Sequence, residues 1–469
     1  MLDDRGGEAI REGMSTRDSD PSLSRREPEA ALFPIPDVPE AAGPDGAGRP
    51  RLRRADRHQV VMRTVALDAL LPEDHTARLV WEYVAGVDCQ ALYAPIRAVE
   101  GRAGRDAIDP RILLALWLYA TLDGVGSARR LEGLCEDHAA YQWICGGVSV
   151  NYHTLSDFRT CRTEFLDALL TRSVAVLLHQ DLVTMQRVAQ DGMRVRASAG
   201  AASFRRRPTL EACRVEAQEQ VETLRKDLAS DPGGASARES AARERAARER
   251  SERIRRALDE MPDVESKKAP EAKAKARVST TDPEARVMKM PDGGFRPAHN
   301  VQFASDTGSQ VIVGVEVVNS GSDQGQMAPM VDQLQERYGK TPPEMLVDGG
   351  FAKKDDIDRL APPNGGTTVY APVCAPKKHK DRDRYEPHAR ESPAVAEWRG
   401  RMGTPEAKAI YKDRASTAEC VNAISRNRGL RQFLVRGLAK VRAVALWFAL
   451  AHNLMRAVAL RVPAAAAMA

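Results

Sequence analysis

Cysteine and long apolar runs are both scarce in this chain of 469 residues. It has 7 Cys, no two of them in a C-x-x-C pair, which excludes a small disulfide-stapled scaffold and predicts reduced thiols in the cytoplasm. The most apolar stretch, Ala443 to Ala451, is bounded by Arg442 and His452 and is too short for a membrane span. The N-terminus has no apolar segment of the kind found in secretory signals. We therefore expect neither membrane insertion nor secretion.

The composition is nevertheless that of a folded protein. Hydrophobic residues make up 43% of the chain and charged residues 29%, values typical of globular proteins. The length predicts about three domains. The formal net charge is +5, from 70 basic and 65 acidic residues, so the placement of charges is more informative than their balance.

Residues 1–57 combine many Pro, Gly and charged residues with few apolar ones. Such a segment cannot bury enough surface to offset its ordering entropy, so it is predicted to be a disordered tail with acidic and basic stretches. Its basic end, which includes Arg49, Arg51, Arg53 and Arg54, is either a solvated tail or an arm that follows DNA phosphates.

Residues 58–180 have the pattern of helices joined by short turns. Asp109 and Pro110 form a typical helix start, and Ser127 caps the next helix after a Gly-rich break. A further helix is expected to begin at Thr154. Four arginines are expected on outer faces of these helices: Arg129, Arg130, Arg159 and Arg162. The pattern suits a helical DNA-binding domain, and a plain helical bundle fits it equally well.

Residues 205–284 form a charged insertion. Apolar residues recur at helical spacing from Leu210 to Leu228, and a second charged helix follows the turn at residues 231–234. The pattern predicts a helical hairpin at 208–261 followed by a Lys/Ala/Pro linker. The hairpin is interpreted either as a solvated arm or as a contact surface for DNA or another subunit.

The rest of residues 186–461 alternates strands and helices. Residues 188–191, 287–290, 311–318, 345–347 and 367–370 are predicted strands, and 326–337, 354–360 and 405–460 are predicted helical segments. Residues 376–400 are expected to form a polar loop. This order predicts an α/β fold with a mixed sheet.

Three acidic residues are expected to meet at this sheet. Asp191 is expected to end the first strand, Asp348 to end a later strand, and Glu419 to lie on the long C-terminal helix. Clustered carboxylates favour hard divalent cations such as Mg²⁺ or Mn²⁺. By contrast, Asp306 is expected to serve a hairpin turn, and Asp323 to cap the helix that follows it.

The spacing of these acids resembles a known family. Tyr411, Arg414 and Glu419, followed by Asn422 and Arg426, are similar to the Tyr-Arg-Glu-Lys signature of bacterial insertion-sequence transposases of the DDE type. The segments DGMRVRAS, starting at Asp191, and VDGGF, around Asp348, resemble the family's two Asp segments. The helical stretch from residue 71 to 159 resembles the N-terminal domain of the same transposases.

The resemblance implies an RNase H-like catalytic domain that is interrupted by the insertion and preceded by the helical DNA-binding domain. It implies that Asp191, Asp348 and Glu419 are catalytic and hold two Mg²⁺ or Mn²⁺ ions. Tyr411 and Arg414 would position DNA. Two departures stand out: the Arg414–Glu419 spacing is one residue longer than the commonest form, and Arg426 replaces the closing Lys.

The function implied is metal-dependent cleavage of element ends and strand transfer into target DNA. The implied partners are double-stranded DNA, comprising terminal inverted repeats and target, and further copies of the chain in a synaptic complex. The expected location is the cytoplasm, in association with the nucleoid. Two alternatives stay open: an RNase H-like nuclease without strand transfer, and an inactive DNA-binding derivative.

Overall fold

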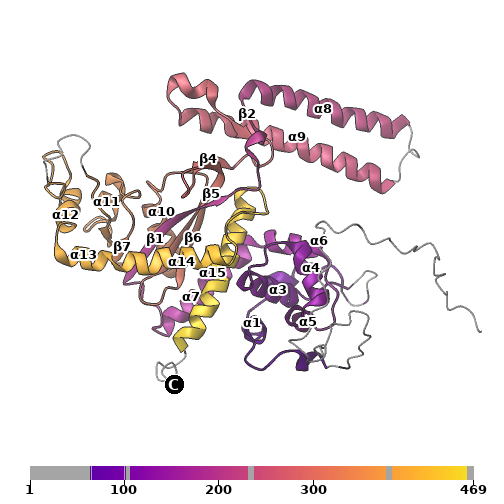
Figure 1. The fold of residues 1–469 in the computed structure, drawn as a ribbon, viewed down its shortest axis with the longest axis horizontal. Helices are drawn as coiled ribbons and strands as arrows, with labels where there is room; N and C mark the ends of the chain where they lie inside the picture. The colour runs from indigo at the N-terminus through magenta and orange to yellow at the C-terminus, as the bar shows by residue number, and fades with distance from the viewer. Residues whose placement is uncertain are drawn as a thin grey trace, which may run out of the picture. The chain divides into compact units, whose positions relative to one another are not determined.

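A ten-residue strand, β1 (Arg187–Arg196), is central to a six-stranded mixed sheet. The structure is a computed structural model that describes residues 64, 66–99, 101, 106–230, 237–375 and 383–461 (Figure 1). The tail expected over residues 1–57 and the turn expected at 231–234 lie outside the described residues. The α/β class predicted from the sequence is confirmed by this mixed sheet and the helices around it.

The sheet is antiparallel on one side of β1 and parallel on the other. β5 (Phe295–Asp306) pairs antiparallel with β1, and both β4 (Arg286–Lys289) and β6 (Ile312–Val318) pair antiparallel with β5. On the other side, β7 (Glu344–Leu346) runs parallel to β1, and β8 (Thr368–Tyr370) runs parallel to β7. A separate ribbon joins β2 (Phe204–Arg205) to β3 (Val278–Ser279).

Helices precede the sheet along the chain. They are η1 (Leu67–Leu70), α1 (Thr76–Ala85), α2 (Gln90–Tyr93), α3 (Pro110–Leu122), α4 (Ala128–Asp137), α5 (Ala139–Cys145), α6 (Tyr152–Thr160) and α7 (Thr163–His179). The caps expected at Asp109 and Ser127 are confirmed, since their side chains accept hydrogen bonds from the amides of Arg111 and Arg130. The start expected at Thr154 is wrong: α6 begins at Tyr152, because Asn151 caps it by accepting the Thr154 amide at 2.9 Å.

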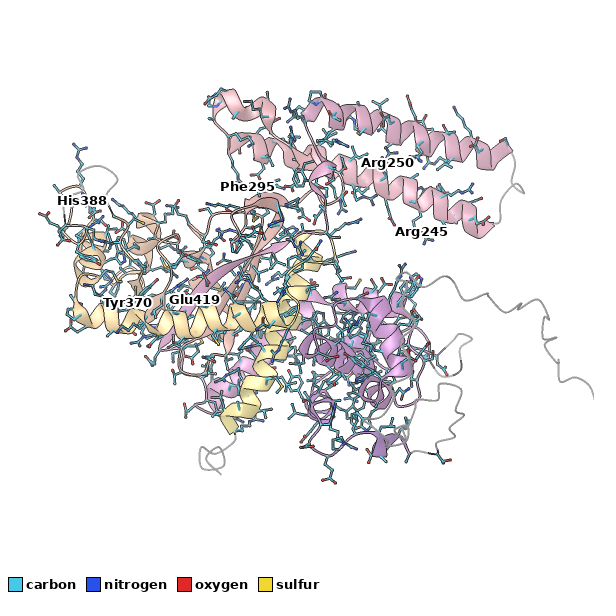
Figure 2. The ribbon with its side chains drawn as sticks, viewed as in Figure 1. Arg245, Arg250, Phe295, Tyr370, His388 and Glu419 are labelled. Atoms are coloured by element: carbon cyan, nitrogen blue, oxygen red, sulfur yellow. The ribbon has the colours of Figure 1, made fainter. Side chains whose placement is uncertain are left out.

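The predicted hairpin is present as α8 (Arg207–Ser230) and α9 (Ala237–Ser266), which lie side by side (Figure 1). Its base has a small core of its own, formed by Leu210, Ala257, Met261, Ala276 and Val278. The short helix η2 (Ala201–Ser203) precedes the insertion, and η3 (Pro270–Lys275) lies within it, after α9. Arg245 and Arg250 lie on α9 (Figure 2).

The remaining helices follow β6. They are α10 (Met327–Tyr338), α11 (Lys354–Leu360), α12 (Pro393–Arg401), α13 (Pro405–Tyr411), the π-helical turn η4 (Ala415–Glu419), α14 (Cys420–Asn427) and α15 (Leu438–Arg461). The loop expected over residues 376–400 is wrong in part, because α12 begins there with Ser392 as its cap. The helical segment expected over 405–460 is interrupted between Asn427 and Leu438.

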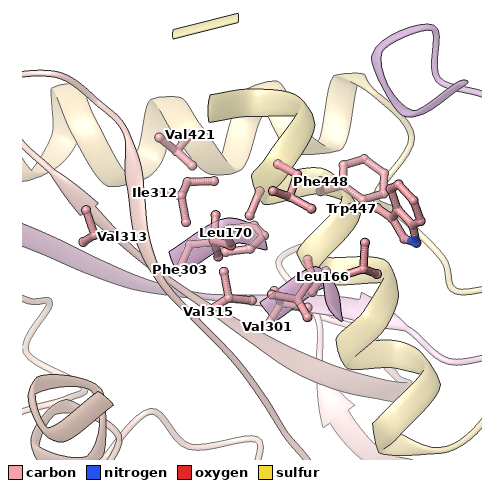
Figure 3. Packing of buried hydrophobic residues seen from close by; sticks show 14 of the residues in the cluster. Leu166, Leu170, Val301, Phe303, Ile312, Val313, Val315, Val421, Trp447 and Phe448 are labelled. Carbon is pink, nitrogen blue, oxygen red and sulfur yellow. The ribbon is translucent and has the colours of Figure 1, made fainter. Parts of the chain in front are cut away.

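One hydrophobic core runs from the N-terminal helices into the sheet. On one face of the sheet, α7 and α15 pack against β6 and η4 packs against β5. Figure 3 shows Leu170, Phe303, Ile312, Val421 and Phe448 in this layer. Among the described residues, α15 is the one helix long and apolar enough to cross a membrane. In its most apolar stretch of 18 residues, 67% is buried inside the protein, so α15 is a core helix here.

Candidate active site

Adjacent parallel strands bring Asp191 and Asp348 together. The register of β1 and β7 pairs Ala189 with Leu346, and Asp191 and Asp348 each follow this pair by two residues. They lie close enough for the charge of Asp348 to raise the pKa of Asp191. β1 continues to Arg196, so Asp191 lies inside the strand, and the expectation that it ends the strand is wrong. Gly192 does not interrupt the strand, because it pairs with Gln302 of β5. Asp191 still adjoins the carboxyl end of β7, where the sheet opens.

The Arg414 guanidinium joins two of the three acids. Its Nη2 donates to Asp191 Oδ1 at 3.1 Å, and its Nη1 donates to Glu419 Oε1 at 3.0 Å. Burial alone would lower the pKa of Arg414, but the surrounding carboxylates, Asp191 foremost, raise it above its ordinary value. Arg414 therefore stays protonated and offsets the negative charge of the cluster.

Glu419 reaches this cluster through a π-helical turn. η4 spans Ala415–Glu419 between α13 and α14, and Glu419 lies on this stretch of helix (Figure 2). A π-turn closes hydrogen bonds at i→i+5, so residues five apart come onto one face. Arg414 and Glu419 are five residues apart, and the turn brings them into contact. The sequence did not predict this turn, although the lengthened Arg414–Glu419 spacing signals it.

Asn422 contacts the cluster in a way that the sequence did not reveal. Its Nδ2 donates to Asp191 Oδ2 at 2.9 Å, so both oxygens of Asp191 are engaged. The available signal was its position three residues after Glu419, which places both side chains on one helical face. Burial raises the pKa of Asp191, Arg414 opposes that shift, and Asp348 adds to it.

The donor chemistry of the cluster fits a hard divalent cation. It offers carboxylate oxygens and the buried Asn422 Oδ1, which has no hydrogen-bond partner. In the part of the chain that the structure describes, no group of three or more His, Cys, Asp or Glu side chains converges closely enough to hold an ion. The guanidinium of Arg414 lies between Asp191 and Glu419, so an ion held by both would require this side chain to move.

Tyr411 lies with the acids and Arg426 does not. Burial raises the pKa of Tyr411, and the charges of Arg414, Asp348, Asp191 and Glu419 also act on its hydroxyl. Arg426 lies two helical turns along α14, in a shallow surface groove. Asp292 also lines this groove and forms an ion pair with Arg296 at 2.6 Å. The basic residues that line it are Arg194, Arg196, Arg296, Arg426 and Arg431.

The expectation that Arg159 points outward is wrong. Only 8% of the residue is exposed, its guanidinium stacks 4.6 Å from the centroid of Trp117, and its Nη1 donates to the Gly126 carbonyl. The apolar ring and the carbonyl offer this side chain a better-packed position than solvent. Arg162, just after α6, is half-buried.

Structural roles were predicted for Asp306 and Asp323, and only the prediction for Asp306 is confirmed. Asp306 serves its hairpin turn as expected, because it accepts hydrogen bonds from the amide and hydroxyl of Ser309. Asp323 does not cap α10. Its Oδ1 accepts from Asn300 at 2.6 Å and from Gln302 at 2.8 Å, and its Oδ2 accepts from Arg194 at 3.1 Å. This buried network lies against Gly192, where an added Cβ would be 2.1 Å from Asp323 Oδ1.

The fold and the cluster define a mixed α/β protein with three acidic residues gathered beside its central strand. Two protein families match the chain: Transposase domain (DUF772) over residues 65–161, and Transposase DDE domain over residues 369–458. Together the two matches support an insertion-sequence DDE transposase. The second match contains Glu419, whereas Asp191 and Asp348 lie outside both. No curated protein and no solved structure matches the chain.

Proposed function

We propose that this transposase cuts the ends of its DNA element and joins them to target DNA, with Asp191, Asp348 and Glu419 as its catalytic residues. The observation that carries the proposal is the parallel pairing of β1 with β7, which brings Asp348 near Asp191, together with the Arg414 bridge from Asp191 to Glu419. The strand order β6–β5–β1–β7–β8, antiparallel up to β1 and parallel beyond it, supports an RNase H-like catalytic domain.

The three carboxylates would hold two Mg²⁺ or Mn²⁺ ions. Such ions activate a water or hydroxyl for attack on a phosphodiester and stabilise the leaving oxygen. Asn422 orients Asp191 by donating to Oδ2. Arg414 neutralises Asp191 and Glu419 before DNA binds, and its fork then suits the phosphate next to the cut. Tyr411, beside the same charges, contributes to positioning that phosphate.

The proposed partner is double-stranded DNA, bound as element ends and as target, in a synaptic complex of several copies of the chain. Arg426 and the basic groove around it would follow the DNA backbone away from the cut. Residues 58–180, including Arg162, would bind the element ends. Residues 186–461, interrupted by 205–284, would form the catalytic domain. DNA cleavage and joining are proposed to take place in the cytoplasm, at the nucleoid.

The test is incubation of the purified full-length protein with a duplex that carries its own element end, with Mg²⁺ or Mn²⁺, and mapping of products at nucleotide resolution. We expect cuts at the element boundary and joined products with added target DNA. Cuts without joined products would indicate a nuclease that lacks strand transfer. Binding without cuts would indicate an inactive derivative, and either result would overturn the proposal.

A further inference from the structure

A cavity of about 310 Å³ lies where the turn between α3 and α4 faces the segment between α14 and α15. Four arginines line it: Arg130, Arg159, Arg428 and Arg431. None of the described residues that line it is acidic. A cavity of this size with four cations and no lining acid is suited to an anion.

Arg428 is the least compensated of these cations. Its Nη1 is buried without a hydrogen-bond partner, and its side chain forms no ion pair with the described residues. Burial lowers the pKa of Arg428, and no neighbouring acid opposes that shift. A half-buried guanidinium without a counter-ion costs stability in the free protein, which indicates that its partner is supplied from outside.

Arg159 adds a second buried cation to the same cavity. Its Nε is also buried without a partner, and burial lowers its pKa to about 10. Its stacking on Trp117 and its bond to the Gly126 carbonyl hold the guanidinium in place. The site is therefore built before any ligand arrives, with a fixed cation in its wall.

The N-terminus of α4 completes the site. Ser127 caps this ten-residue helix and lines the cavity, so the positive end of the helix dipole lies at the same place. Across the cavity, Gly429 adopts φ +97° and lies against the backbone of Gly124, with 3.4 Å between its ideal Cβ position and the Gly124 carbonyl oxygen. This close approach joins the two segments that hold the arginines.

We infer that this cavity, hereafter the Arg159–Arg428 pocket, binds a backbone phosphate of DNA. DNA is favoured over a free anion because the pocket shares Leu430 and Arg431 with the basic groove that contains Arg426, so the cations continue beyond it. The inference rests on the proposed function, because it names a contact for the same DNA outside the cluster of acids.

The pocket is tied to the acids through α14. Glu419 immediately precedes this helix and Arg428 immediately follows it, nine residues later. At about 1.5 Å per residue the separation along the axis is about 14 Å. A DNA strand advances about 3.4 Å per nucleotide, so at least about four nucleotides would separate the bound phosphate from the cut.

The test uses the full-length protein and fluorescence anisotropy with a labelled duplex that carries the element end, at several salt concentrations. Arg428→Gln is expected to weaken binding about tenfold and to flatten the plot of log affinity against log salt by about one unit. Arg428→Lys keeps the charge and should keep the slope. The matched control is Arg172→Gln, which removes the same charge from the exposed surface of α7 and should change affinity less than about twofold.

Two further arms separate the source of the phosphate from effects on folding. Inorganic phosphate should raise the Tm of the wild-type protein and not that of Arg428→Gln. For the wild-type protein, neutral methylphosphonates placed one at a time from about four nucleotides inside the cut inward should weaken binding about tenfold at one position, and one placed ten nucleotides away on the flanking side should not. The methylphosphonate experiment uses only the wild-type protein, so it tests phosphate binding by the pocket even if a substitution disturbs folding.

Equal DNA affinity and salt slope for wild type and Arg428→Gln would overturn the inference and leave the proposed function intact. A phosphate effect on Tm without any effect on DNA binding would show that the pocket takes free anions, which also overturns it. If the wild-type protein bound no duplex at all, the inference and the proposed function would both fail.

Discussion

Arg414 and Glu419 are bonded at 3.0 Å although they are five residues apart, one more than the usual helical pair. The π-turn η4 explains the contact, because it adds one residue to the turn without moving the two side chains onto different faces. The extra residue relative to the commonest transposase signature is therefore accommodated locally. The longer Arg414–Glu419 spacing does not separate the two side chains.

The fork of Arg414 leads to a stability prediction for the metal-free protein. Arg414→Lys should lower the free energy of unfolding by about 2 kcal/mol, because one ammonium cannot reproduce both Nη contacts with Asp191 and Glu419. Urea unfolding measures the change. Arg172→Lys, at an exposed pair with Asp88, should change the same quantity by less than about 0.5 kcal/mol. Equal effects of the two substitutions would contradict the bridging role.

The buried network behind β1 leads to a prediction for Gly192. Gly192→Ala should cost about 3 kcal/mol of folding stability, because its Cβ would be 2.1 Å from Asp323 Oδ1 and 2.6 Å from Gln302 Nε2. Gly133→Ala in α4 is the matched control, since nothing lies within 4 Å of its Cβ, and it should stabilise the protein by about 1 kcal/mol. Thermal unfolding of both variants checks the pair, and a tolerated Gly192→Ala would show that the network yields easily.

Local signals in the sequence located many elements of this fold. Asp109 and Pro110 fix the start of α3 because cap and first-turn chemistry act within a few residues. The same chemistry at Ser392 and Pro393 marks α12, which the charged surroundings obscured. These are properties of neighbouring residues, so a single sequence carries them.

Contacts between segments far apart in the chain were harder to predict from the sequence. The Asp191–Arg414 bond joins residues 223 positions apart, and the sequence alone gave it only through the family resemblance. The burial of Arg159 depends on Trp117, from a different helix, so helical periodicity could not reveal it. The Asp323 network likewise depends on Gly192 having no side chain, which becomes visible only once β1 and β5 are paired.

His452 gives the protein a predictable pH dependence. Burial lowers the pKa of His452 to about 4, and its Nε2 donates to the Gln310 carbonyl at 2.8 Å. In the unfolded chain the pKa is about 6.5, so the unfolded state takes up the proton first as the pH falls. The neutral, buried His452 therefore contributes fully to folding stability above about pH 6.5. As the pH falls toward 4 this contribution is lost, and the free energy of unfolding falls by about 2 kcal/mol between pH 7 and pH 5.

The measurement for His452 is the difference in unfolding free energy between wild type and His452→Gln at pH 7 and at pH 5. Glutamine keeps an N–H donor and does not titrate, so the variant should lose about 2 kcal/mol less than wild type over this range. His153→Gln, at an exposed position on α6, should follow wild type closely. Parallel pH profiles for wild type and His452→Gln would remove His452 as the source.

Asp348 is the acid whose substitution tests the proposed catalytic cluster most directly. It follows β7 by two residues, and its Oδ1 accepts the Gly350 amide at 2.6 Å, which fixes the carboxylate at the edge of the sheet beside Asp191. Asp348→Asn keeps the shape of the side chain and removes the charge that attracts a divalent cation. Cleavage of element ends should fall by several orders of magnitude, because water activation and leaving-group stabilisation are lost together.

DNA affinity of Asp348→Asn should stay the same or increase, because phosphate contacts are made by cations and one negative charge has been removed. Asp191→Asn and Glu419→Gln should behave alike, and Mn²⁺ should raise the Tm of the wild-type protein more than that of any of the three variants. Asp355→Asn, at an exposed site on α11, removes an equal charge and should cut at the wild-type rate. An Asp348→Asn protein that cut element ends as fast as wild type would exclude Asp348 from the active site, and the pairing of β1 with β7 would then no longer locate the chemistry.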